Sequence, residues 1–168
     1  VPIHRLKTFD QDSPWPDDRF TGEWVVEWPN GQLKFRAHYL DGKANGDYRC
    51  FSEEGRVVQE GRMCRGECVG RWVDYQHDTG SILAERVYLD GHCEGIERSY
   101  FDNGNVMSER SHRQGVLHGP FRWFLRDGQL AFEGEYQEGE PWDGVCEVEG
   151  FDQQVDGSYS SLAEFRCG

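Results

Sequence analysis

The sequence predicts an all-β protein: an elongated, twisted antiparallel sheet of about five tandem β-hairpin repeats with short terminal caps. Three observations lead to this prediction. Glycines recur every 24 or 25 residues, the residues between them alternate between apolar and polar, and Asn-Gly or Asp-Gly pairs stand where each hairpin must reverse. Because a lone hairpin cannot bury its apolar face, neighbouring hairpins are expected to continue one sheet.

The glycines form three series that stay in register along the chain. The first series is Gly22, Gly46, Gly70, Gly95, Gly119 and Gly144; the second is Gly31, Gly55, Gly80, Gly104 and Gly128; the third is Gly42, Gly66, Gly91, Gly115 and Gly139. They divide the chain into an N-terminal cap (1–21), five repeats (22–45, 46–69, 70–94, 95–118 and 119–143), and a partial sixth repeat with a C-terminal cap (144–168).

Between the second and third glycine of each repeat, every other residue is predicted to face the core. In the first repeat these positions hold Leu33, Phe35, Ala37 and Tyr39, and the same slots of other repeats include Arg86 and His112. The alternate positions, among them Lys34, Arg36 and Ala131, are expected to face solvent. The segment after each first-series glycine is rich in aromatics, with Glu97 as an exception.

Composition narrows the classes of partner. The formal net charge of −13 disfavours nucleic acid and anionic membranes and favours a partner with a basic surface. No apolar stretch is long enough to span a membrane. No metal-ligand spacing, phosphate loop or nucleophile motif is present, so we expect no enzyme activity, no cofactor and no metal.

Six cysteines form an even set, which is compatible with disulfides in an oxidising compartment. Cys64 and Cys68 bracket a turn and are candidates for one bridge; Cys146 and Cys167 are candidates for another. The alternative is a set of free thiols in the cytoplasm. Together with an opening Val1 in place of Met, which leaves room for a removed signal peptide, the cysteines favour a periplasmic location.

The repeat resembles a known family. Gly22, Asn30-Gly31, Leu33, Tyr39 and Asp41-Gly42-Lys43 with a closing Gly46 are similar to the MORN-variant repeat, and the resemblance covers residues 22 to about 144. Bacterial arrays of this type are often grouped as YwqK-family antitoxins. The resemblance therefore implies an immunity protein that binds and occludes a toxic effector, such as a type VI secretion lipase. The alternative is a non-catalytic scaffold or membrane-associated adaptor.

Exposed aromatics and an acidic cluster are the candidate contacts for such a partner, because interfaces favour aromatic anchors and complementary charge. The candidates are Trp28, Trp72, Tyr75, Tyr100, Trp123, Glu133, Glu135 and Glu138. The alternative places the aromatics in the core and the carboxylates on a solvated face.

Overall fold

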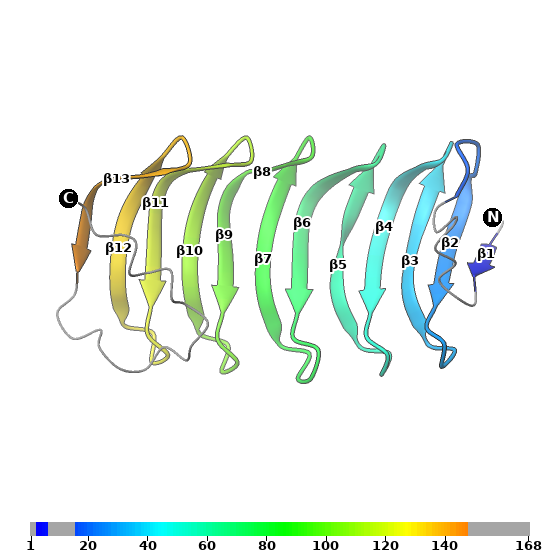
Figure 1. Cartoon of the computed structure of the whole chain (residues 1–168), viewed down its shortest axis with the longest axis horizontal. Helices are drawn as coiled ribbons and strands as arrows, with labels where there is room; N and C mark the ends of the chain where they lie inside the picture. Colours follow the sequence, from blue (N-terminus) through cyan, green and yellow to red (C-terminus); the bar gives the residue numbers. More distant parts are fainter. Residues whose placement is uncertain (1–2, 7–15, 148–168) are drawn as a thin grey trace.

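The computed structural model describes residues 3–6 and 16–147, with the backbone alone for 3–6 and 142–147. All regular structure in these ranges is β (Figure 1). The strands are β1 (Ile3–Leu6), β2 (Gly22–Glu27), β3 (Leu33–Leu40), β4 (Lys43–Phe51), β5 (Val57–Cys64), β6 (Glu67–Tyr75), β7 (Ile82–Leu89), β8 (His92–Cys93), β9 (Gly95–Tyr100), β10 (Val106–Arg113), β11 (Val116–Phe124), β12 (Leu130–Gln137) and β13 (Glu140–Glu147). The all-β prediction is confirmed.

The strands form one open sheet in chain order. β2 to β13 run antiparallel as a meander, β8 is a short branch that pairs only with β7, and β1 adds to β2 in parallel. The hairpins β2–β3, β4–β5, β6–β7, β9–β10 and β11–β12 thus stand side by side (Figure 1). The predicted sheet of tandem hairpins is confirmed. Trp15 and the predicted C-terminal cap beyond Glu147 lie outside the described residues.

Two kinds of turn close the two long edges of the sheet. Between hairpins, both central residues have positive φ, as at Asp41 (49°) and Gly42 (72°), which is the backbone of a tight type I′ turn. Within hairpins the loop is longer: Gly31 N–H donates to the Trp28 carbonyl, and only the glycine of Asn30-Gly31 has positive φ. The third repeat has a four-residue loop, 77–80, which accounts for its extra residue.

The turns between hairpins form what we call the turn edge, the upper edge in Figure 1, made of residues 17–21, 41–43, 65–67, 90–94, 113–116 and 138–140. Each turn glycine donates its backbone N–H to a carbonyl one repeat earlier. The pairs are Gly42 to Phe20 (2.9 Å), Gly66 to Ala44 (2.8 Å), Gly91 to Cys68 (3.2 Å), Gly115 to Cys93 (2.9 Å) and Gly139 to Leu117 (2.8 Å). This ladder joins successive repeats beyond their strand pairing.

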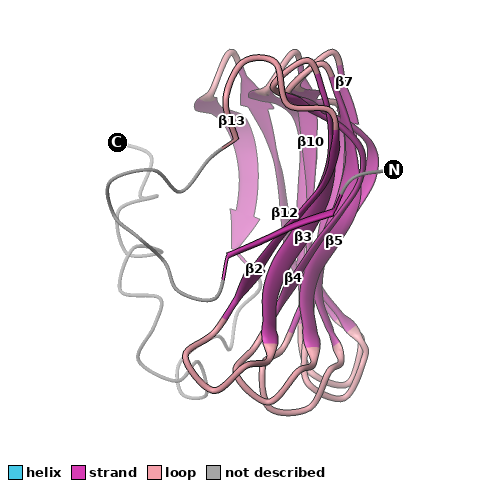
Figure 2. Cartoon of the chain, turned by 90° about the vertical axis from the view of Figure 1, so that its right-hand side faces the viewer, coloured by secondary structure: helices cyan, strands magenta, loops and turns pink. Residues whose placement is uncertain are grey.

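The first-series glycines occupy β-bulges. Between β3 and β4, for example, Tyr39 pairs with Ala44 and Ala37 with Tyr48, so two extra residues of β4, including Gly46 at φ 129°, bulge out. Bulges bend and twist the strand that contains them. Their repetition explains why the sheet is bowed in side view (Figure 2).

The two sides of the sheet differ in chemistry. One side, which we call the aromatic face, holds the main core cluster of Trp24, Val26, Phe35, Ala37, Tyr39 and Ala44. The opposite side, the charged face, is the predicted solvent side. That prediction was wrong for Ala131, which is only 3% exposed.

Candidate binding surface

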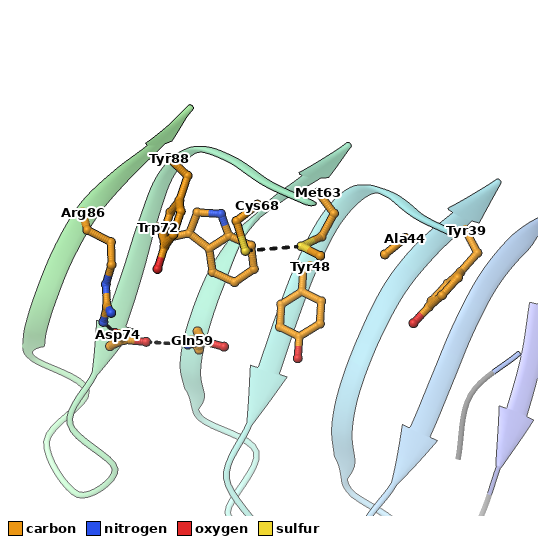
Figure 3. Close-up of a pocket in the computed structure, with 10 residues that line it drawn as sticks. All are labelled: Tyr39, Ala44, Tyr48, Gln59, Met63, Cys68, Trp72, Asp74, Arg86 and Tyr88. Atoms are coloured by element: carbon orange, nitrogen blue, oxygen red, sulfur yellow. Dashed lines mark hydrogen bonds and ion pairs between the residues drawn. The ribbon is translucent and has the colours of Figure 1, made fainter. Parts of the chain in front are cut away.

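The aromatic face continues as a row of rings across the second and third hairpins (Figure 3). The centroids of Tyr48 and Trp72 are 5.4 Å apart, and those of Trp72 and Tyr88 are 6.1 Å apart. Trp72 lies over Gly61 and donates its indole N–H to the Arg62 carbonyl at 3.2 Å. With Met63 and Cys68, these rings line a depression of about 360 Å³.

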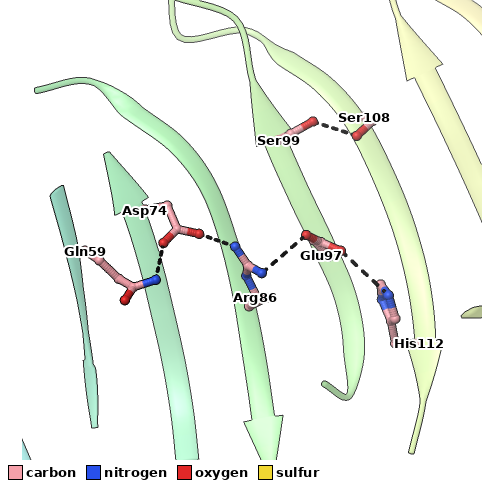
Figure 4. Close-up of polar contacts among 7 residues, drawn as sticks. All are labelled: Gln59, Asp74, Arg86, Glu97, Ser99, Ser108 and His112. Atoms are coloured by element: carbon pink, nitrogen blue, oxygen red, sulfur yellow. Dashed lines mark hydrogen bonds and ion pairs between the residues drawn. The ribbon is translucent and has the colours of Figure 1, made fainter. Parts of the chain in front are cut away.

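The depression ends in polar groups rather than rings. Gln59 Nε2 donates to Asp74 Oδ1 at 2.7 Å, and the other Asp74 oxygen accepts a hydrogen bond from Arg86. Arg86 also lies 3.9 Å from Glu97 Oε1, and Glu97 Oε2 lies 3.6 Å from His112 Nε2. The five side chains form a chain across β5, β6, β7, β9 and β10 (Figure 4), which we call the polar chain.

Two groups beside this chain are left without partners. The Nδ1 atom of His112 is buried and has no hydrogen-bond partner. Arg110 lies between Glu97 on β9 and Phe121 on β11 in the strand register, which puts it on the aromatic face. It is half-buried, and it makes no ion pair or hydrogen bond with the described residues because Glu97 faces Arg86 and His112 instead.

The charged face carries a different arrangement, in which opposite charges alternate from strand to strand. The ion pairs are Arg49–Glu60 (2.9 Å), Arg71–Glu85 (2.7 Å), Arg98–Glu109 (2.9 Å), Arg122–Glu109 (3.5 Å) and Arg122–Glu133 (3.6 Å). We call this set the ion-pair ladder. The arginines of this ladder thus already have carboxylate partners.

Two predicted tyrosine contacts belong to the ladder. Tyr75 donates its hydroxyl to Glu60 at 2.8 Å, and Tyr100 donates to Glu85. Burial, and then the hydrogen bond to Glu85, raise the pKa of Tyr100 to about 12. Both rings therefore serve contacts between neighbouring hairpins.

The remaining partner candidates occupy three different places. Trp72 and Trp123 are each 7% exposed on the aromatic face, whereas Glu133 and Glu135 are exposed on the charged face and Glu138 is exposed on the turn edge.

Trp28 lies in a hairpin loop. Its indole N–H donates to the Phe51 carbonyl at 3.0 Å, and Lys34 Nζ lies 4.4 Å from a ring centroid. The predicted set is thus spread over both faces and both edges instead of converging on one surface.

The cysteines form no disulfide among the described side chains. Cys64 and Cys68, predicted as a pair, are free thiols because the register sets Cys64 opposite Glu67 and Cys68 opposite Met63. The Cys68 sulfur lies 3.7 Å from that of Met63 on the aromatic face. Cys146 has no described side chain, and Cys167 lies outside the described residues.

Burial raises the pKa of the Cys50, Cys68 and Cys93 thiols. A catalytic cysteine needs the opposite shift. Within the described part of the chain, no cluster of His, Cys, Asp or Glu is arranged to hold a metal, and no helix could span a membrane.

The polar chain and Arg110 are the residues that sequence reasoning missed as a site. The signal was present, because Glu97 and His112 occupy positions that are aromatic in most other repeats, and Arg86 occupies one that is Ala37 or Gly134 elsewhere. Those departures were noticed one by one. The cross-strand register brings them together.

Comparison with known proteins supports the repeat assignment. Residues 20–41, 94–114 and 117–138 match the family described as MORN repeat variant. A search of curated proteins found no match. The matched segments cover β2 with β3, β9 with β10, and β11 with β12, each close to one hairpin of the sheet. Three hairpins of this open β sheet therefore match the MORN repeat variant, which suggests a repeat scaffold with a protein-binding role.

Proposed function

We propose that this protein is an immunity or antitoxin-type protein: a non-catalytic scaffold that binds a toxic bacterial effector and neutralises it by covering it. The observation that carries the proposal is the aromatic face together with its acidic border. The turn edge carries eight carboxylates but only four Lys or Arg side chains, so it is acidic. The carboxylates are Asp17, Asp18, Asp41, Glu67, Asp90, Glu94, Glu138 and Glu140; the cations are Arg19, Lys43, Arg65 and Arg113.

This layout has the anatomy of a protein interface. Stable interfaces have a centre rich in aromatic residues and a polar rim, and complementary rim charge speeds association. Here the rings of Tyr48, Trp72 and Tyr88 form the centre and the turn edge forms an acidic rim. A basic effector, proposed to be a type VI secretion effector such as a lipase, would match that rim.

The test is protection from toxicity. A secreted effector of the native organism is expressed with the protein in a sensitive host, and growth is measured for two variants with equal charge changes. In one, Asp41 and Asp90 of the turn edge become Asn; in the other, Glu53 and Glu54 of a hairpin loop become Gln. We expect weaker protection and a salt-dependent loss of association only for the turn-edge variant. Full toxicity with the unmodified protein would refute the proposal.

A membrane-associated adaptor is the alternative, and the ion-pair ladder argues against it. Lipid-binding repeats need unpaired Lys and Arg on one face, whereas Arg98 and Arg122 here contact carboxylates. Flotation with phosphatidylserine vesicles distinguishes the two, since co-flotation at physiological salt would favour the adaptor. The proposed location is the periplasm, with the cytoplasm as the alternative, and cell fractionation of the native host decides between them.

A further inference from the structure

We infer that the aromatic face binds a partner segment in which a carboxylate lies between apolar side chains, and that Arg110 is the residue that recognises this carboxylate. The inference rests on the proposed function, which supplies a protein partner. It adds the chemistry of the segment that contacts this face. It also departs from the expectation from net charge alone, which would place only basic groups of the partner against this protein.

The first step is that the repeat does not need a cation at this position. In the strand register, Arg110 faces Phe121 of the next hairpin just as Ala37 faces Tyr48. Within its own hairpin Arg110 faces Glu97, just as Ala37 faces Trp24 and Gly61 faces Tyr48. Those smaller residues make room for the neighbouring ring. An arginine in the same row has no role in hairpin packing that Ala or Gly does not fill elsewhere.

The second step is that the Arg110 guanidinium is uncompensated. Arg86, on the same face, contacts the carboxylates of Asp74 and Glu97, and the arginines of the ion-pair ladder contact theirs on the charged face. Arg110 is half-buried among the aromatic rows and has no such contact with the described residues. Partial burial of an unpaired charge costs stability, so a ligand that supplies a carboxylate gains a strong, charge-assisted contact.

The third step is the surroundings of this cation. On one side lie Phe121 and the rings that contact it, Phe132 at 4.9 Å and Tyr136 at 5.1 Å between centroids. On the other side lie the polar chain and, beyond it, the depression lined by Trp72. A segment that crosses the strands therefore meets the rings around Trp72, then the polar chain and Arg110, and then the rings around Phe121, which fits a segment with an acidic residue between apolar ones.

The test is selection from a displayed library of random peptides on the purified full chain. We expect the enriched peptides to contain Asp or Glu flanked by apolar residues. Arg110→Met keeps the apolar stem, and should bind these peptides at least about tenfold more weakly because a charged hydrogen bond is lost. Arg36→Met, at a half-buried arginine of the charged face, has the same charge change and should bind them normally.

A reversed variant separates recognition from collapse of the surface. Arg110→Glu should select peptides with Lys or Arg in place of the acidic residue. Arg110→Met should unfold at no lower urea concentration than the unmodified protein, whereas Arg110→Glu faces Glu97 in the register and should unfold at a somewhat lower one. The inference would be overturned if no peptides were enriched, if the enriched peptides showed no preference for Asp or Glu, or if Arg110→Met bound them as tightly as the unmodified protein. The proposed function would survive any of those results, because protection from the effector is measured separately. Conversely, if the protein failed to protect the host but still selected acidic peptides, only the proposed function would be rejected.

Discussion

Gly61 provides a sharp test of how the hairpins pack, because it lies under the Trp72 ring. A Cβ atom placed on Gly61 would be 2.2 to 2.7 Å from three ring atoms of Trp72, closer than any real contact. Gly61 has no positive φ, so the backbone itself would accept alanine. In Gly61→Ala, the indole must therefore move, and its hydrogen bond to the Arg62 carbonyl breaks.

The expected cost can be worked from these contacts. Overpacking costs about 1–3 kcal/mol, and the lost hydrogen bond costs about 1 kcal/mol. Replacement of glycine within a strand offsets about 0.5–1 kcal/mol of this. We expect Gly61→Ala to lower the free energy of unfolding by about 2 kcal/mol, measured by urea titration with far-ultraviolet circular dichroism.

A double-mutant cycle isolates the contact. With Trp72→Leu already present, Gly61→Ala should be neutral or slightly stabilising, because the smaller side chain leaves room for the new methyl group. The coupling free energy should then be about 2 kcal/mol, the whole cost of the steric conflict. If Gly61→Ala destabilised both backgrounds equally, the cost would come from the backbone and the packing argument would be refuted.

Three further predictions test the edges and the charged face. Gly42→Ala should destabilise the protein more than Gly66→Ala. Both glycines have positive φ, but a Cβ atom on Gly42 would lie 2.4 Å from the backbone of Asp18, whereas one on Gly66 would meet nothing within 4 Å. Equal urea midpoints for the two variants would contradict this. Glu109→Gln, which breaks pairs to arginines of β9 and β11, should cost under about 1 kcal/mol, and the cost should shrink in 1 M salt because exposed pairs are screened. Because the pKa of Tyr100 is raised from 10.0 to about 12, its contribution to stability is complete below about pH 10 and is lost as the pH rises towards about 12. The decrease in the free energy of unfolding at alkaline pH should therefore be smaller in Tyr100→Phe. An unchanged decrease in that variant would count against the hydrogen bond to Glu85.

The architecture was predictable from sequence because its determinants are local. Asp41-Gly42 and its equivalents adopt a backbone that few other pairs accept, so a period of such pairs predicts a period of turns. Alternation then assigned Phe35 and Tyr39 to the buried side, as observed. Neither step requires knowledge of which strands lie side by side.

The polar chain was not predictable by the same means, because it depends on cross-strand register. Each bulge inserts two residues into one strand, which changes the partners of every residue beyond it. The spacing of Arg86, Glu97 and His112 along the chain therefore does not reveal that they meet. The cysteine prediction failed for a related reason: sequence proximity suggested a bridge between Cys64 and Cys68, but register paired each with a different residue.

The contrast between the two faces is the strongest argument for where a partner binds. On the charged face most strands contribute to the ion-pair ladder, and Glu109 contacts both Arg98 and Arg122. On the aromatic face Arg86 contacts two carboxylates, whereas Arg110, which lies opposite Glu97 and Phe121 in the register, has no ion pair with the described residues. A half-buried cation without such a contact reduces stability. Retention of that cation is explained if the missing carboxylate arrives with the partner.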